Sequence, residues 1–173
     1  ASYMRTENTP RESETGMSRT TRATQALAKA GVAFETVSYD YDPDAPRVGL
    51  QAAEAIGEEP RRVLKTLMAL VDGRPVCAVI PSDREASMKK LAAAFGGKSA
   101  EMMKPAEAER LTGYHVGGIS PFGQKKAVPT AIEAQAMGET YVFLNGGQRG
   151  LQVKLSSQTA LEALNAKAAP LVA

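Results

Sequence analysis

Apolar positions in the first third of the chain recur at helical spacing and then at every second residue. Residues 20–30 carry apolar side chains on one helical face and are followed by Gly31, which predicts a helix that ends at that glycine. Residues 32–39 alternate between apolar and polar side chains, as a half-buried strand does. The turn-rich segment 40–46 follows, and the pattern then predicts a short helix over about 50–56.

The strongest local pattern predicts a β-hairpin. Residues 61–71 and 75–80 are mostly apolar, and the Asp-Gly pair at 72–73 between them is favoured in two-residue hairpin turns. Lys65 lies inside the first strand, where a solvated lysine is not expected on the buried face. Two interpretations stay open: Lys65 extends to solvent at a sheet edge, or its ammonium group reaches a phosphate or a developing oxyanion in a cleft.

The second half of the chain continues this mixture of periods. Ser87 is a typical helix-capping residue, and two glycines end the apolar segment that follows it. The chain carries about seven strands and about five helices in irregular order, which predicts an α+β fold: a mixed-strand open barrel or sheet flanked by helices. The remaining predicted elements are helices over 87–95, 105–111 and 157–166 and strands over 98–102, 130–134, 140–144 and 151–155.

Length and composition are those of one globular domain. The chain has 173 residues, of which 43% are hydrophobic and 23% charged. We expect the domain to span 17–173 and the polar segment 1–16 to be a disordered tail or a cloning remnant. No apolar run is as long as a membrane span and no secretory signal pattern is present, so we expect a cytoplasmic protein that does not bind a membrane. The net charge of +2 does not by itself indicate a nucleic-acid-binding protein.

The chain holds one cysteine and one histidine, which excludes an internal disulfide and a Cys/His zinc site. Cys77 lies in an apolar run, where a thiol behaves as a small hydrophobe and its pKa rises. We expect His115 to point outward, so neither residue supports nucleophilic catalysis. Nucleotide-binding, metalloprotease and paired-carboxylate motifs do not occur, and we expect no cofactor and no metal.

The segment 113–126, GYHVGGISPFGQKK, is the main candidate for chemistry. Its apolar residues alternate as in a half-buried strand, but two adjacent glycines, at 117 and 118, interrupt the pattern. Because these glycines carry no side chains, the N–H groups of Gly118, Ile119 and Ser120 can converge on one oxygen, as in an oxyanion hole. A structural β-bulge followed by a tight turn is the alternative, and the glycine pattern alone favours this structural interpretation.

The remaining candidate chemistry consists of Lys65, Thr66, hydroxyl groups and a second glycine-rich turn at 145–150. Such groups can position a reactive ester and stabilise an oxyanion, but they include no evident general base. If the protein is an enzyme, the substrate itself or a water molecule must supply the nucleophile.

Five motifs resemble those of one known family. They are YDYDP at 39–43, VLKTL at 63–67, LAAAFGG at 91–97, TGYHVGGISPFGQKK at 112–126 and GGQRGL at 146–151. In this order, and over roughly 20–166, they resemble the YbaK/EbsC family of Cys-tRNA(Pro) deacylases, which are related to the editing domain of prolyl-tRNA synthetases. The resemblance implies a mixed β-barrel flanked by helices, trans-editing of mischarged tRNA, and prolyl-tRNA synthetase as a partner.

The resemblance also implies roles for individual residues. Lys65 matches the lysine that holds the terminal adenosine of the tRNA, and Gly117 matches the glycine whose backbone orients the aminoacyl group, so these two are the catalytic candidates. In this family the cysteinyl thiol is thought to attack its own ester carbonyl and release a thiolactone, which would make the enzyme a lyase instead of an ester hydrolase. The substrate-binding candidates are Tyr39, Thr66, Gly118, Ile119, Ser120, Asn145 and Gly146.

Three functional hypotheses stay open. The first is release of cysteine from Cys-tRNA(Pro). The second is editing of Ala-tRNA(Pro) or another small aminoacyl-tRNA by water attack, because Asn145 and Gln152 differ from the residues common at these positions in the family. The third is a non-catalytic module that binds the acceptor end of tRNA or a synthetase. Its candidate phosphate contacts are Arg61, Arg62, Lys125, Lys126 and Arg149.

Overall fold

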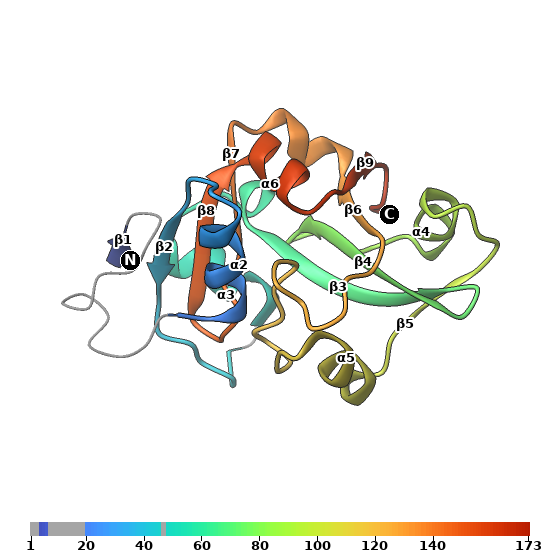
Figure 1. Cartoon of the computed structure of the whole chain (residues 1–173), viewed down its shortest axis with the longest axis horizontal. Helices are drawn as coiled ribbons and strands as arrows, with labels where there is room; N and C mark the ends of the chain where they lie inside the picture. The colour runs from blue at the N-terminus through green and yellow to red at the C-terminus, as the bar shows by residue number, and fades with distance from the viewer. Residues whose placement is uncertain (1–3, 7–19, 46–47) are drawn as a thin grey trace.

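The computed structural model of the chain describes residues 4–6, 20–45 and 48–173. Within these ranges the chain forms five α-helices, two short 3-10 helices and nine strands (Figure 1). In chain order they are β1 (Met4–Thr6), α2 (Arg22–Lys29), β2 (Glu35–Ser38), α3 (Val48–Ile56), η1 (Pro60–Arg62), β3 (Leu64–Val71), β4 (Arg74–Pro81), α4 (Met88–Ala94), β5 (Ala100–Met102), α5 (Pro105–Thr112), β6 (Thr130–Glu133), η2 (Ala134–Gly138), β7 (Tyr141–Asn145), β8 (Leu151–Ser156), α6 (Ser157–Ala163) and β9 (Lys167–Ala169).

The strands form two sheets. One sheet has the order β1-β2-β8-β7 and is antiparallel throughout. The other has the order β5-β3-β4-β6-β9 and is mixed, because β4, β6 and β9 run parallel to one another. A single bridge between Val63 and Phe143 joins them where β3 begins. Neither sheet closes on itself, and the predicted α+β fold with an open, mixed strand arrangement is confirmed.

The predicted hairpin is formed by β3 and β4, which extend together as the long ribbon in Figure 1. Asp72 and Gly73 both have positive φ angles, 49° and 80°, as a two-residue turn of the favoured type requires. The Asp72 carboxylate accepts hydrogen bonds from the backbone N–H groups of Lys98 and Ser99, and these bonds lower its pKa. The turn is therefore tied to the chain that follows α4.

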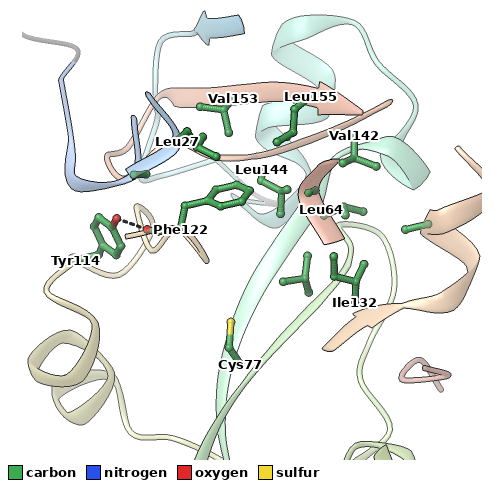
Figure 2. Packing of buried hydrophobic residues seen from close by; sticks show 14 of the residues in the cluster. Leu27, Leu64, Cys77, Tyr114, Phe122, Ile132, Val142, Leu144, Val153 and Leu155 are labelled. Atoms are coloured by element: carbon green, nitrogen blue, oxygen red, sulfur yellow. Dashed lines mark hydrogen bonds between the residues drawn. The ribbon is translucent and has the colours of Figure 1, made fainter. Parts of the chain in front are cut away.

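The main core fills the space between the two sheets (Figure 2). Alternation on β4 sends Cys77 and Val79 into this core, while Val76, Ala78 and Ile80 pack on the opposite face. Helix α2 adds Leu27 to the same core. Other members are Leu64, Phe122, Ile132, Val142, Leu144, Val153 and Leu155.

Helices cover the outer faces of both sheets. Ala53 and Ile56 of α3 pack with residues of β2 and β7 against the four-stranded sheet. Leu91 and Ala92 of α4 pack against the outer face of the five-stranded sheet. Ser87 caps α4 as predicted, because its side chain accepts the N–H of the third residue of the helix. None of the helices in the described ranges is long and apolar enough to cross a membrane.

The predicted strand within 113–126 is wrong. The chain there forms turns and bends, because Gly113 ends α5 in the left-handed conformation and Gly117 also has a positive φ angle of 91°. Tyr114 is nevertheless buried, and its hydroxyl group donates a hydrogen bond to the carbonyl oxygen of Phe122 (Figure 2). The apolar residues of this segment therefore fix a loop at separate points and do not form one face of a strand.

Two strands have no counterpart in the sequence prediction. β1 falls in the expected tail 1–16, most of which lies outside the described residues, and it pairs with β2. β9 pairs with β6 in parallel near the end of the chain. The buried carboxylate of Glu133 accepts the backbone N–H groups of Leu171 and Val172, at 2.8 and 3.0 Å, and fixes the segment after β9.

Candidate functional site

A cavity of about 220 Å³ lies where the two sheets meet and the loop after α5 approaches them. One side consists of strand residues, Lys65 and Thr66 of β3 and Gln152 of β8, which we call the strand wall. The facing loop residues that line the cavity, Val116, Gly117 and Ile119, form the loop wall. Tyr39, Tyr41, Ala52, Val63, Leu64, Ser82 and Asn145 complete the lining.

Lys65 lies on the strand wall with its side chain 26% exposed. Its Nζ is 3.7 Å from a carboxylate oxygen of Glu85, whose side chain is 88% exposed. An ion pair with so exposed a partner contributes only about 0 to 1 kcal/mol, so an incoming phosphate can replace it at little cost. Of the two interpretations of Lys65, its place in the cavity lining supports the ammonium group that reaches into a cleft.

The strand wall carries two polar atoms that have no partner. Thr66 Oγ1 and Gln152 Oε1 are buried, and among the described residues neither makes a hydrogen bond. Gln152 is only 4% exposed. A buried polar atom without a partner costs about 1 to 3 kcal/mol, which makes both atoms candidates for a bound ligand or water.

Tyr39 lies next to this pair. Burial, and then the neighbouring Tyr41, raise the pKa of its hydroxyl group, while hydrogen bonds from Gly150 and Gln152 oppose that shift. The hydroxyl group therefore stays protonated at neutral pH and can act as a hydrogen-bond donor, but not as a base.

At position 117 both the neighbouring side chains and the backbone conformation disfavour a side chain. An added Cβ there would lie 2.9 Å from Nε of Arg149 and 3.0 Å from the hydroxyl oxygen of Tyr41. The φ angle of 91° is also unfavourable for any side chain. Gly117 thus exposes main chain to the cavity where another residue would place a side chain.

Side chains from other segments fasten this main chain. Arg149 Nε donates to the carbonyl oxygen of Val116 at 2.9 Å, and its guanidinium carbon lies 5.4 Å from the centre of the Tyr41 ring. The Val116 N–H donates to a carboxylate oxygen of Glu109 at 2.9 Å. Asn145 Nδ2 donates to the carbonyl oxygen of Gly117 at 3.3 Å. The backbone on both sides of Gly117 is therefore held in one conformation.

One donor of the predicted oxyanion hole is wrong. The N–H of Gly118 donates to the carbonyl oxygen of His115 at 2.8 Å, so it is not available to a substrate. Ser120 is fully buried and does not belong to the cavity lining. Of the three donors that the glycine pattern predicted, only Ile119 belongs to the cavity lining.

Six of the nine predicted catalytic and substrate-binding residues line the cavity. Both catalytic candidates, Lys65 and Gly117, line the cavity. Gly146 does not: its N–H pairs with the carbonyl oxygen of Leu151. Of the remaining substrate-binding candidates, Tyr39, Thr66, Ile119 and Asn145 line the cavity, while Gly118 and Ser120 do not.

Seven lining residues lay outside those predictions, and the hydroxyl-bearing ones among them are Tyr41 and Ser82. Tyr41 is two positions from Tyr39, so strand-like alternation would have placed both on one side of the chain. Ser82 directly follows β4, opposite the start of β3, and its N–H donates to the carbonyl oxygen of Val63.

The predicted phosphate contacts do not form one surface at the cavity. Arg61 and Arg62 pair with Glu139, at 3.3 and 2.9 Å, and further carboxylates neutralise both. Lys125 and Lys126 are exposed on the loop after the site but do not line the cavity. Arg149 is also exposed, and its Nε is engaged by the loop wall.

The cysteine and the histidine lie as their surroundings predicted. Burial raises the pKa of the Cys77 thiol to about 12, so the thiol is neutral and inert at pH 7. The His115 side chain is 91% exposed, with Nδ1 3.8 Å from a carboxylate oxygen of Glu109. Within the ranges that the structure describes, His, Cys, Asp and Glu form no group of three that could hold a metal ion.

Comparison with known families finds that residues 43–163 match the aminoacyl-tRNA editing domain. The chain belongs to the aminoacyl-tRNA editing domain family. Over 114 residues this editing domain is 40% identical to the Enterococcus faecalis protein named "Putative Cys-tRNA(Pro)/Cys-tRNA(Cys) deacylase EbsC", a match that covers 65% of the chain and 70% of the relative. The predicted resemblance to the YbaK/EbsC family is confirmed, and the family's activity gives the chain an enzymatic role in editing aminoacyl-tRNA.

Two further matches relate the editing domain to synthetases and to a known fold. It is 37% identical over 75 residues to proline--tRNA ligase of Maridesulfovibrio salexigens, where the match covers 43% of the chain and 13% of the synthetase. Its fold matches a crystal structure described as "a putative trans-editing enzyme for prolyl tRNA synthetase", with a TM-score of 0.77, 22% identity and coverage of 88% of this chain and 95% of that one.

Proposed function

We propose that this editing domain releases cysteine from mischarged Cys-tRNA(Pro) by cleaving the aminoacyl ester, acting in trans in the cytoplasm with prolyl-tRNA synthetase as a partner. One observation carries the proposal: Lys65 and the side-chain-free backbone at Gly117 line the same cavity. The cation suits the phosphate or ribose of a terminal nucleotide, and the bare main chain suits an aminoacyl group.

The chemistry of the lining supports attack by the substrate's own thiol. No carboxylate or imidazole group is among the described residues that line the cavity, so a general base is missing from the wall. In the proposed step the cysteinyl sulfur bonds to the ester carbonyl carbon, the bond from that carbon to the ribose oxygen breaks, and the thiol proton passes to the ribose oxygen. The products are a cyclic thiolactone and free tRNA. An intramolecular attack of this kind gains an effective molarity of about 10⁵ M or more.

A second candidate is hydrolysis of Ala-tRNA(Pro), or of another small aminoacyl-tRNA, by a bound water. The unpartnered oxygens of Thr66 and Gln152 favour it, because an ordered water requires polar partners of this kind. Selectivity separates the two reactions: an alanyl group has no side-chain nucleophile for intramolecular attack, so the thiol mechanism cannot release it.

The test is a deacylation panel on tRNA(Pro) charged with cysteine, alanine or proline. We expect release of cysteine alone, and release of alanine at an equal or higher rate would favour the water mechanism. Lys65→Ala should reduce cysteine release by about 100-fold or more, because the cation that holds the terminal nucleotide in position for the reaction is lost. Lys89→Ala, which removes an exposed lysine of α4, is the matched control. Binding of tRNA without release of any amino acid would instead indicate a non-catalytic module.

A further inference from the structure

We propose that Arg149 is a positioning residue, which aims the N–H of Gly117 into the cavity as the hydrogen-bond donor to the ester carbonyl oxygen of the substrate. The inference rests on the proposed function, and it replaces both the predicted Gly118 donor and the simple phosphate-contact role predicted for Arg149. The inference rests on the geometry of one peptide plane, the one that joins Val116 to Gly117.

The geometry of a trans peptide transmits the constraint. Arg149 Nε holds the carbonyl oxygen of Val116 at 2.9 Å. In a planar trans peptide the C=O and the N–H of the following residue point in opposite directions. Arg149 is not part of the cavity lining, whereas Gly117 is. Turning the Val116 oxygen toward Arg149 therefore turns the Gly117 N–H away from Arg149. Among the described residues that N–H has no acceptor.

The peptides before and after the Val116–Gly117 peptide are also held by hydrogen bonds. The Val116–Gly117 plane therefore cannot rotate through a compensating rotation of its neighbours. Glu109 accepts the N–H of Val116 at 2.9 Å from the side of α5. Asn145 donates to the oxygen of Gly117 at 3.3 Å from the end of β7. With the peptides before and after it fixed, the orientation of the Val116–Gly117 peptide depends on its one direct side-chain bond, which is that of Arg149.

The contacts of Arg149 use properties that lysine lacks. The guanidinium group lies over the Tyr41 ring, with 5.4 Å between its carbon and the ring centre, while Nε donates sideways to the loop. A lysine carries the same charge but has no planar group and no Nε–H. Arg149→Lys therefore separates positioning from electrostatic attraction of phosphate.

The experiment compares Arg149→Lys and Arg149→Ala on two substrates, Cys-tRNA(Pro) and cysteinyl-adenosine, which carries no phosphate. We expect both variants to lower kcat by about 10-fold to 100-fold on both substrates, with KM for cysteinyl-adenosine unchanged, because a transition-state donor is misaligned. A pure phosphate contact predicts near wild-type kinetics for Arg149→Lys, and a raised KM for Arg149→Ala on the tRNA alone. That result would overturn the inference.

Matched variants at Arg110, an exposed arginine of α5, serve as controls and should behave as the wild type. If the wild type releases cysteine from neither substrate, the proposed function fails. The role of Arg149 can still be tested by NMR, which needs no turnover. In amide NMR spectra, the Gly117 signal should shift or broaden in Arg149→Lys and stay unchanged in Arg110→Lys. An unchanged Gly117 signal in Arg149→Lys would contradict the inference whatever the activity. Thermal unfolding midpoints identify variants that fail to fold.

Discussion

The two walls of the cavity are built on opposite principles. On the strand wall the backbone is fixed by sheet hydrogen bonds, and two side-chain oxygens, those of Thr66 and Gln152, remain without partners. On the loop wall the backbone belongs to no sheet, and side chains from other segments, among them Arg149 and Glu109, are used to hold it. The strand wall thus has polar side-chain atoms without hydrogen-bond partners. On the loop wall, in contrast, side chains of other segments use their hydrogen bonds to hold the main chain.

This contrast separates the effects expected of mutations. A change on the strand wall should remove a contact to the substrate and leave the fold intact, because strand geometry depends on backbone pairing. A change on the loop wall should alter the geometry of the site, because side-chain contacts to Val116 and Gly117 help to hold that backbone. Three experiments test this separation.

The largest effect is expected for Gly117→Ala. The new Cβ would meet Nε of Arg149 at 2.9 Å and would force a side chain into a backbone with a φ angle of 91°. We expect cysteine release to fall by about 100-fold or more, since the loop must shift away from the substrate, and stability to fall by about 1 to 3 kcal/mol. Release assays and denaturant unfolding measure the two effects. In the control Gly138→Ala, the added Cβ meets nothing within 4 Å. Wild-type activity in Gly117→Ala would show that the loop wall is not fixed.

A moderate effect, in opposite directions for stability and activity, is expected for Thr66→Val. The change removes a buried hydroxyl oxygen that has no partner, so the free energy of unfolding should rise by about 1 kcal/mol. If that hydroxyl group meets the substrate, kcat/KM should fall by about 10-fold. Thr130→Val is the contrasting control, because it breaks a hydrogen bond to Val128 and should destabilise. A variant that is more stable and equally active would exclude Thr66 from the site.

The smallest effect is expected for chemical labelling of the Cys77 thiol, which lies in the core that supports the strand wall. Its thiol pKa of about 12, against an ordinary value of 9.0, leaves about a thousandfold less thiolate at pH 8 than in the unfolded chain. Labelling by iodoacetamide should therefore be slow between pH 7 and 9 and fast in urea. Stabilisation by the buried neutral thiol is complete below pH 9 and is lost as pH rises toward 12. Arg149→Lys should not accelerate labelling, and acceleration would show that the two walls are coupled.

Sequence patterns predicted the strand wall better than the loop wall, and the reason is physical. The β3–β4 hairpin and the cap of α4 depend on residues close in the chain, so Asp72, Gly73 and Ser87 were sufficient to predict them. The contact between Arg149 and Val116 joins residues 33 positions apart, and no local pattern encodes it. The strand predicted around Tyr114 failed for the same cause: its apolar residues have partners, but not on a neighbouring strand.

The sequence patterns also did not predict strand pairing between segments far apart in the chain. β9 pairs in parallel with β6, more than thirty residues earlier, and the pattern KAA contains no alternation that would reveal a strand. Resemblance to a family, in contrast, selected Lys65 and Gly117, which line the cavity, from a chain in which the glycine pattern alone favoured a structural bulge.

The close approach around Gly117 limits how such a pocket can evolve. A position whose backbone conformation favours glycine offers selection no side chain to vary, so adapting this position to remove a different amino acid from tRNA costs stability. The opposite wall is free of that restriction, because β3 and β8 keep their pairing whatever side chains they display. New substrate preferences should therefore arise by exchange at positions 66 and 152, while the loop is inherited unchanged.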